Sequence, residues 1–128
     1  MRIFVYGTLK RGHRLHHHLA GQCFVGQART RPEYRLVNCG WYPALIESSP
    51  GRSIDGEVWE VSGETLECLD EVEGVSNGLY MRRVIALQAP FDDAPVMTYF
   101  YLQSIDGLSD CGDEWTISSA ELDQSDDT

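Results

Sequence analysis

The chain has 128 residues, of which 42% are hydrophobic, so it has the length of one domain and enough apolar side chains to form a core. Its formal net charge of -10 argues against nucleic acid as the main partner, since phosphate binding needs a basic surface. No apolar run approaches the roughly 18 residues that a membrane helix needs, so we expect a cytoplasmic protein with no membrane partner. The oligomeric state cannot be predicted.

The charges are unevenly distributed. Residues 1–35 contain seven of the ten cations and a single acid, Glu33, whereas the rest of the chain contains nineteen acids and three cations. A small anion could therefore find a positive site near the N-terminus, while the acids as a whole are typical of a solvated surface. The four cysteines form no C-x-x-C pair, so we predict no metal site.

The predicted elements are mostly strands. A first strand covers 2–6, and residues 13–20 favour a short helix that Gly21 ends. One clear helix is predicted at 62–73. Further strands are expected where β-branched and aromatic residues gather between turn signals, at 23–30, 34–38, 43–48, 56–61, 80–87 and 96–103. This pattern predicts an α+β fold with a curled sheet or small barrel of about six strands.

The end of the chain has a different character. Hydrophobic periodicity is lost from Ser104 onward, and the last residues are mostly acidic. We therefore predict one domain over 1–115 and an acidic, flexible tail over 116–128.

The helix SGETLECLDEVEG places one carboxylate where an apolar residue belongs. Leu66 and Leu69 define its apolar stripe. Glu73 lies seven residues after Leu66 and four after Leu69, in the middle of that stripe, and Asp70 lies at its edge. A half-buried glutamate has a raised pKa, which suits a general base or acid near neutral pH. Alternatively, Glu73 bends out to water or pairs with a nearby arginine such as Arg82. We interpret Asp70 as a structural hydrogen-bonding residue.

The first predicted strand leads into an unusual bend, Tyr6-Gly7-Thr8-Leu9, which Lys10, Arg11 and Gly12 follow. A simple turn needs fewer special residues. A loop that holds an anion with its own backbone N–H groups would need about this many.

Several of these segments together resemble the gamma-glutamylcyclotransferase-like family, which includes the gamma-glutamylamine cyclotransferases and AIG2-like proteins. The likeness covers roughly residues 3–103, in the order VYGTLKRG, GWYPAL, GEVWEV and LECLDEVEG followed by LYMRR. The resemblance implies a small mixed barrel with flanking helices and no cofactor or metal. One departure is the run His13 to His18, where many relatives carry an asparagine.

The resemblance also implies a site. Glu73 matches the family's catalytic glutamate, and Tyr6, Gly7, Thr8 and Leu9 match the loop that lines the pocket and offers N–H donors. Further expected pocket residues are Tyr80 and, less strongly, Tyr42. One of Tyr99 and Tyr101 could reach the pocket, and Lys10 and Arg11 could attract a carboxylate.

The implied function is a cofactor-free enzyme of acyltransferase or lyase type acting on a small gamma-glutamyl compound. The substrate's α-amine attacks its own amide carbonyl, which gives 5-oxoproline and a free amine or amino acid, with Glu73 as base and acid. Two alternatives stay open: a non-catalytic module that binds small carboxylates in the same pocket, and a gamma-glutamyl amide hydrolase.

Overall fold

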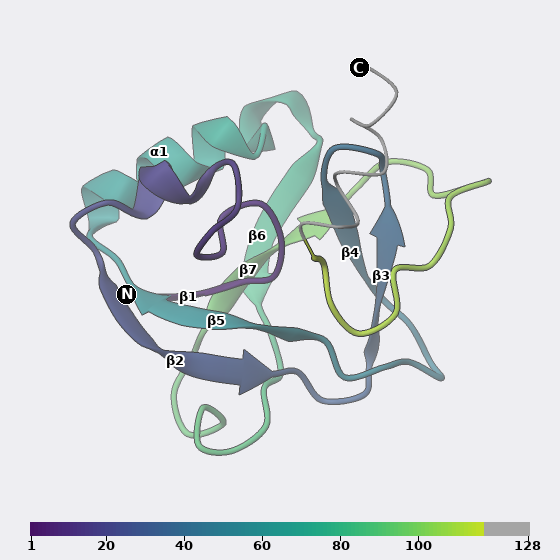
Figure 1. The fold of residues 1–128 in the computed structure, drawn as a ribbon, viewed down its shortest axis with the longest axis horizontal. Helices are drawn as coiled ribbons and strands as arrows, with labels where there is room; N and C mark the ends of the chain where they lie inside the picture. Colours follow the sequence, from purple (N-terminus) through teal and green to yellow (C-terminus); the bar gives the residue numbers. More distant parts are fainter. Residues whose placement is uncertain (117–128) are drawn as a thin grey trace.

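The computed structural model describes residues 1–116, which form seven strands and few helices (Figure 1). The α+β fold class is confirmed. The helical elements are η1 (His16–Leu19), α1 (Gly63–Val72) and η2 (Val75–Asn77). The strands are β1 (Arg2–Val5), β2 (Cys23–Arg29), β3 (Tyr34–Asn38), β4 (Pro43–Glu47), β5 (Asp55–Glu60), β6 (Tyr80–Val84) and β7 (Met97–Tyr101).

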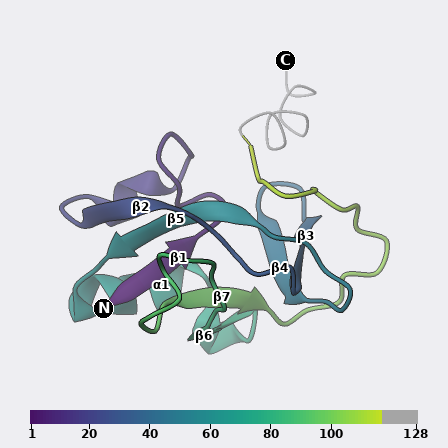
Figure 2. The same cartoon turned by 90° about the horizontal axis from the view of Figure 1, so that it is seen from below.

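The strands form a five-stranded sheet in the order β2-β5-β1-β7-β6 and a separate two-stranded sheet, β3-β4. β1 is the central strand. It pairs antiparallel with β5, from Arg2 opposite Glu60 to Val5 opposite Glu57, and parallel with β7. The five-stranded sheet is therefore mixed. Both views place the β3-β4 pair at one end of it (Figures 1 and 2).

Side chains of β1 alternate between two hydrophobic clusters, because successive residues of a strand point to opposite faces. Ile3 and Val5 pack with Leu66 and Leu69 of α1. Phe4 belongs to the other cluster, which contains Leu36 of β3 and its neighbours. Both faces of the sheet are thus covered, and the loop that follows β1 starts where the two clusters meet.

The ends of α1 follow the sequence signals. The Ser62 side chain accepts a hydrogen bond of 3.1 Å from the Thr65 N–H, which caps the first turn. Gly74 adopts a φ of 71°, the left-handed conformation that ends a helix most easily when the residue is glycine. Glu73 is therefore held on the last turn.

The predicted helix over 13–20 is wrong in extent, because only η1 is helical and it is a 3-10 turn. Contacts outside the segment account for this. The His16 ring lies 5.2 Å from that of Trp59, and its Nδ1 is 3.0 Å from the Leu9 carbonyl oxygen. The last two predicted strands are shorter than expected, since Leu87 leaves the hairpin and bridges to Thr30.

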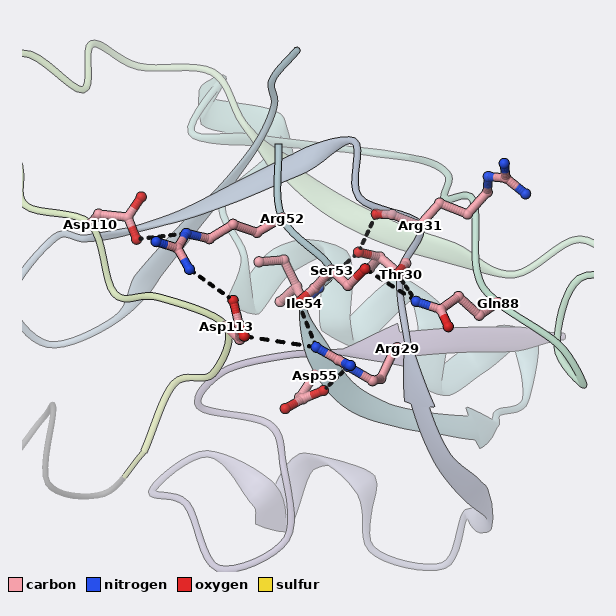
Figure 3. Close-up of polar contacts among 10 residues, drawn as sticks. All are labelled: Arg29, Thr30, Arg31, Arg52, Ser53, Ile54, Asp55, Gln88, Asp110 and Asp113. Carbon is pink, nitrogen blue, oxygen red and sulfur yellow. Dashed lines mark hydrogen bonds and ion pairs between the residues drawn. The ribbon is translucent and has the colours of Figure 1, made fainter. Parts of the chain in front are cut away.

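Residues 110–115 are tied back onto the domain. Asp113 pairs with Arg29 at 3.7 Å and with Arg52 at 3.2 Å, and Asp110 pairs with Arg52 at 3.9 Å (Figure 3). Trp115 is fully buried in the core. The packed structure thus reaches the predicted boundary at 115, whereas the predicted tail, from its second residue onward, lies outside the described residues. Within residues 1–116, no helix is long and apolar enough to cross a membrane.

Candidate active site

One pocket brings together Glu73 and the six residues that the family resemblance implies for substrate binding. It is lined by the loop after β1, by Glu73 at the end of α1, and by Tyr42 and Tyr80. The full lining is Phe4, Val5, Tyr6, Gly7, Thr8, Leu9, Tyr42, Pro43, Glu73, Tyr80 and Tyr99. Residues from five separate parts of the chain therefore meet at one point.

Glu73 has an unusual environment for a carboxylate. Its backbone N–H donates to the Leu69 carbonyl, but its side-chain oxygens accept no hydrogen bond and form no ion pair within residues 1–116. Burial raises the pKa of Glu73 to about 7, and the nearby positive charge of Arg14 opposes that rise. The expected alternative partner, Arg82, is bound elsewhere. At neutral pH this carboxyl therefore exchanges readily between its two protonation states.

Three tyrosines surround the carboxylate, and none of them donates to it. The Tyr6 hydroxyl donates to the Tyr99 carbonyl at 2.6 Å, and the Tyr80 hydroxyl donates to the Pro43 carbonyl at 2.6 Å. The Tyr99 hydroxyl donates to Asp70 at 2.7 Å. Burial raises the pKa of all three phenols, and the charge of Glu73 raises each further. The three phenols therefore remain neutral, and each donates its hydrogen bond to an acceptor other than Glu73.

Asp70 holds this arrangement in place. Its two carboxylate oxygens accept from the Arg82 guanidinium at 2.9 and 3.1 Å, and one of them also accepts from Tyr99. This bidentate pair is the structural role predicted for Asp70. Tyr99 is thereby the strand residue that reaches the pocket, whereas the alternative, Tyr101, packs against Tyr80 outside it.

The loop after β1 leaves hydrogen-bond donors free. Within the described part of the chain, the backbone N–H groups of Gly7, Thr8 and Leu9 have no acceptor. Free N–H groups in a row can bind a carboxylate or an oxyanion. Gly7 is required for another reason than a close ligand: a Cβ at this position would lie 2.5 Å from Cγ of Pro43. The glycine lets the loop pack against the pocket wall.

The expected role of Lys10 and Arg11 in attracting a carboxylate to this pocket finds no support in the geometry, because both side chains turn to a different cavity. Lys10 is buried and its ammonium donates to the Trp115 carbonyl at 2.5 Å. Arg11 pairs with Glu57 at 3.3 Å and lies over the Phe24 ring. The side chains of Lys10 and Arg11 thus point away from the pocket that the preceding loop lines.

That second cavity is the larger of the two, with about 520 Å³ against about 20 Å³ beside Glu73. Its charged walls are largely neutralised: Glu57 is paired with Arg11, and Asp55 with Arg29 at 2.6 Å. The Glu73 pocket has room for about one water molecule. A larger ligand therefore requires its mouth to open, and the unpaired carboxylate makes this smaller pocket the better candidate site.

Sequence reasoning missed the hydrogen bond that Pro43 accepts and the charge of Arg14 at this site. Pro43 lines the pocket and accepts the Tyr80 hydroxyl through its carbonyl, which no side-chain pattern could indicate. Arg14 acts on Glu73 through its charge, and only folding reveals that proximity. Within residues 1–116, no group of three His, Cys, Asp or Glu side chains could hold a metal ion.

This small α+β domain combines a half-buried carboxyl of raised pKa with a loop that has free N–H groups, which is a class of site suited to proton transfer. Comparison with known families gives the class a name, since the model for "Gamma-glutamyl cyclotransferase, AIG2-like" matches residues 3–121. The chain therefore belongs to the gamma-glutamyl cyclotransferase, AIG2-like family. The family resemblance inferred from sequence is confirmed.

Individual relatives agree with this assignment. A Vibrio cholerae protein that carries the gamma-glutamylcyclotransferase name is 39% identical over 111 residues, 87% of this chain and 92% of its own. Human gamma-glutamylaminecyclotransferase is 38% identical over 101 residues, 73% of this chain and 65% of the human one. The crystal structure of a mouse AIG2-like protein superposes with a TM-score of 0.66 at 31% identity, covering 77% of this chain and 75% of that one. Family and relatives support a gamma-glutamylcyclotransferase-like activity.

Proposed function

We propose that this protein converts a small gamma-glutamyl compound into 5-oxoproline and a free amine, with Glu73 as the group that moves the protons. The observation that carries the proposal is the unpaired Glu73 carboxyl, whose pKa of about 7 suits both proton uptake and proton release. A pocket that only bound ligands would have no need of a buried carboxyl without a partner, because such a group destabilises the fold.

The reaction is internal to the substrate. The α-amine attacks the γ-carbonyl carbon, a carbon–nitrogen bond closes the five-membered lactam, and the bond to the leaving nitrogen breaks. Two protons leave the α-nitrogen, which begins as an ammonium, and two reach the leaving nitrogen. A single carboxyl that accepts and returns a proton in each transfer is sufficient. Holding the substrate folded supplies much of the rate, because the reacting groups are already joined.

The remaining pocket groups suit the other parts of such a substrate. The free N–H groups of Gly7, Thr8 and Leu9 are donors for the α-carboxylate or for the oxyanion that develops on the γ-carbonyl. The hydroxyls of Tyr80 and Tyr99 donate their hydrogen bonds to other acceptors, so their oxygens can accept hydrogen bonds from the α-ammonium. Since the pocket holds about one water molecule, its walls must move apart when substrate enters.

The test is a mass-spectrometric assay of the full-length protein with a panel of gamma-glutamyl amines and gamma-glutamyl dipeptides. We expect stoichiometric release of 5-oxoproline and the free amine. Release of free glutamate would mean that water is the nucleophile and that the protein is a hydrolase. If no compound is turned over but several stabilise the protein against heat, the pocket is a binding module and the proposal fails.

A further inference from the structure

Arg14 differs from every other arginine in the described part of the chain. The protein has nine arginines and a net charge of -10, so acidic partners are abundant. Eight arginines form an ion pair with a carboxylate, and Figure 3 shows the ion pairs of Arg29 and Arg52. They are Arg2, Arg11, Arg29, Arg31, Arg35, Arg52, Arg82 and Arg83. Arg14 pairs with none within residues 1–116, which leaves its charge available to a ligand.

This guanidinium lies near the candidate active site, where its positive charge acts on Glu73. Its Nε and Nη2 donate to the Trp41 carbonyl at 3.4 and 3.1 Å, and Trp41 directly precedes the pocket residue Tyr42. On the other side, the N–H of the next residue, Leu15, donates to the Thr8 carbonyl in the pocket loop at 2.9 Å. Residues 14–15 are therefore bonded both to the pocket loop and to the residue before Tyr42, while the Arg14 side chain is exposed.

The hydrogen bonds of Arg14 leave capacity for a second partner. A guanidinium has five N–H donors, and the Trp41 carbonyl occupies two of them. A carboxylate can take two parallel hydrogen bonds from the same fork, and these are stronger than bonds to a neutral carbonyl. An anionic group that reaches the mouth would thus compete well for Arg14.

In the proposed function, the glutamyl part of the substrate lies inside the pocket, where Glu73 and the loop N–H groups contact it. The leaving amine then points outward toward Arg14. We infer that Arg14 binds a carboxylate carried by the leaving amine, so that the preferred substrates are gamma-glutamyl amino acids rather than gamma-glutamyl compounds of neutral or cationic amines. This inference rests on the proposed function for the orientation of the substrate.

Two compounds of nearly equal shape test the inference: gamma-glutamyl-alanine and gamma-glutamyl-alaninamide, which lacks only the terminal charge. We expect the wild type to turn over the acid about tenfold more efficiently, judged by kcat/KM for 5-oxoproline release. Arg14→Gln should reduce that ratio to near one, mainly by loss of the acid. The control Arg31→Gln removes an equal charge from an exposed ion pair with Glu33, and it should keep the tenfold ratio.

Binding of the same two compounds to Glu73→Gln, measured by calorimetry with and without Arg14→Gln, separates this inference from the proposed function. If the wild type forms no 5-oxoproline but gamma-glutamyl-alanine binds about tenfold tighter than its amide, and only when Arg14 is present, the proposed function fails and the assignment of Arg14 holds. The inference is overturned if the wild type treats both compounds alike, or if neither binds. It is also overturned if Arg14→Gln weakens both equally, since Arg14 would then serve the shared glutamyl part or the pocket walls.

Discussion

Two cavities of this protein each contain a glutamate shielded from water, Glu57 buried and Glu73 half-buried, and the two carboxylates have opposite hydrogen-bond environments. Glu57, in the larger cavity, is 5% exposed and accepts hydrogen bonds from the Arg11 N–H, the Arg11 guanidinium and the Trp59 indole. Glu73, in the smaller cavity, accepts none within residues 1–116. Hydrogen bonds to the ionised form favour it, whereas burial without them favours the neutral form. Glu57 is therefore held in the structure by three hydrogen bonds, whereas Glu73 is a carboxyl that can carry a proton.

The comparison shows that cavity size is a poor guide to chemistry in this molecule. The cavity of about 520 Å³ has charged walls that neutralise one another, whereas the pocket of about 20 Å³ contains a carboxyl that accepts no hydrogen bond within residues 1–116. Three tyrosine protons near Glu73 are directed to other acceptors, so the lack of a partner is built into the surrounding hydrogen bonds.

The largest predicted effect is the loss of activity when Glu73, but not Glu57, is replaced by glutamine. Glu73→Gln keeps the size of the side chain and should lower 5-oxoproline release by about 10²- to 10⁴-fold. Glu57→Gln should leave the rate per folded molecule near that of the wild type while lowering the free energy of unfolding by about 1–3 kcal/mol. Rates and urea unfolding curves of the two variants measure both effects. Equal loss of activity in both would end the distinction between the two glutamates.

The second prediction concerns the pH dependence of stability. The pKa of Glu73 is raised from 4.5 to about 7 on folding, so the folded state favours the protonated carboxyl. The contribution of Glu73 to the free energy of unfolding therefore falls as pH rises from about 4.5 through 7. At pH 8, Glu73→Gln should be more stable than the wild type by up to about 3 kcal/mol, since each pKa unit corresponds to 1.36 kcal/mol.

The control for that measurement is the same pair of proteins at pH 4, where Glu73 is protonated in both states and the difference should nearly vanish. Urea unfolding at a series of pH values gives the difference directly, and other titrating groups cancel between the two proteins. A constant difference across this range would contradict the raised pKa.

The third prediction concerns the support for Tyr99. Asp70→Asn removes the charge that holds Arg82 and weakens the acceptor of the Tyr99 hydroxyl. We expect a loss of about 1–3 kcal/mol in the free energy of unfolding and a lower rate of 5-oxoproline release. Arg83→Gln is a matched control, because Arg83 lies next to Arg82 on β6 but pairs with the exposed Glu47. This substitution should change stability and the rate of 5-oxoproline release little. Unchanged stability of Asp70→Asn would contradict the claim that this carboxylate supports Arg82 and Tyr99.

The smallest predicted effect is that of Tyr80→Phe, which leaves the Pro43 carbonyl without its donor. The free energy of unfolding should fall by about 1 kcal/mol, because a single buried hydrogen bond is lost. Activity should fall chiefly through a higher KM if the phenol oxygen receives the substrate's ammonium. A lower kcat with an unchanged KM would argue instead for a part in the proton transfers.

Much of this site could be predicted because local periodicity places residues on a helix face. The positions of Leu66, Leu69 and Glu73 follow from helix geometry alone, and the buried leucines confirm that α1 turns this face inward. The direction of the loop after β1 could not be predicted. Lys10 follows Leu9 in sequence, yet its side chain points to Trp115, because the loop turns between them. The lack of an ion pair at Arg14 within residues 1–116 could not be predicted from the sequence either, because ion pairing depends on residues far apart in the chain.

The most direct test of the central claim is the titration of Glu73 itself. Carbon-13 NMR of protein labelled at its glutamate side-chain carboxyls, recorded from pH 3 to pH 9, would follow each glutamate separately, and Glu73→Gln would identify the resonance of interest. The account predicts that this resonance titrates near pH 7 and moves when a gamma-glutamyl compound binds. A Glu73 carboxyl that titrates in the ordinary range near pH 4 would contradict it, because such a group cannot return a proton at neutral pH.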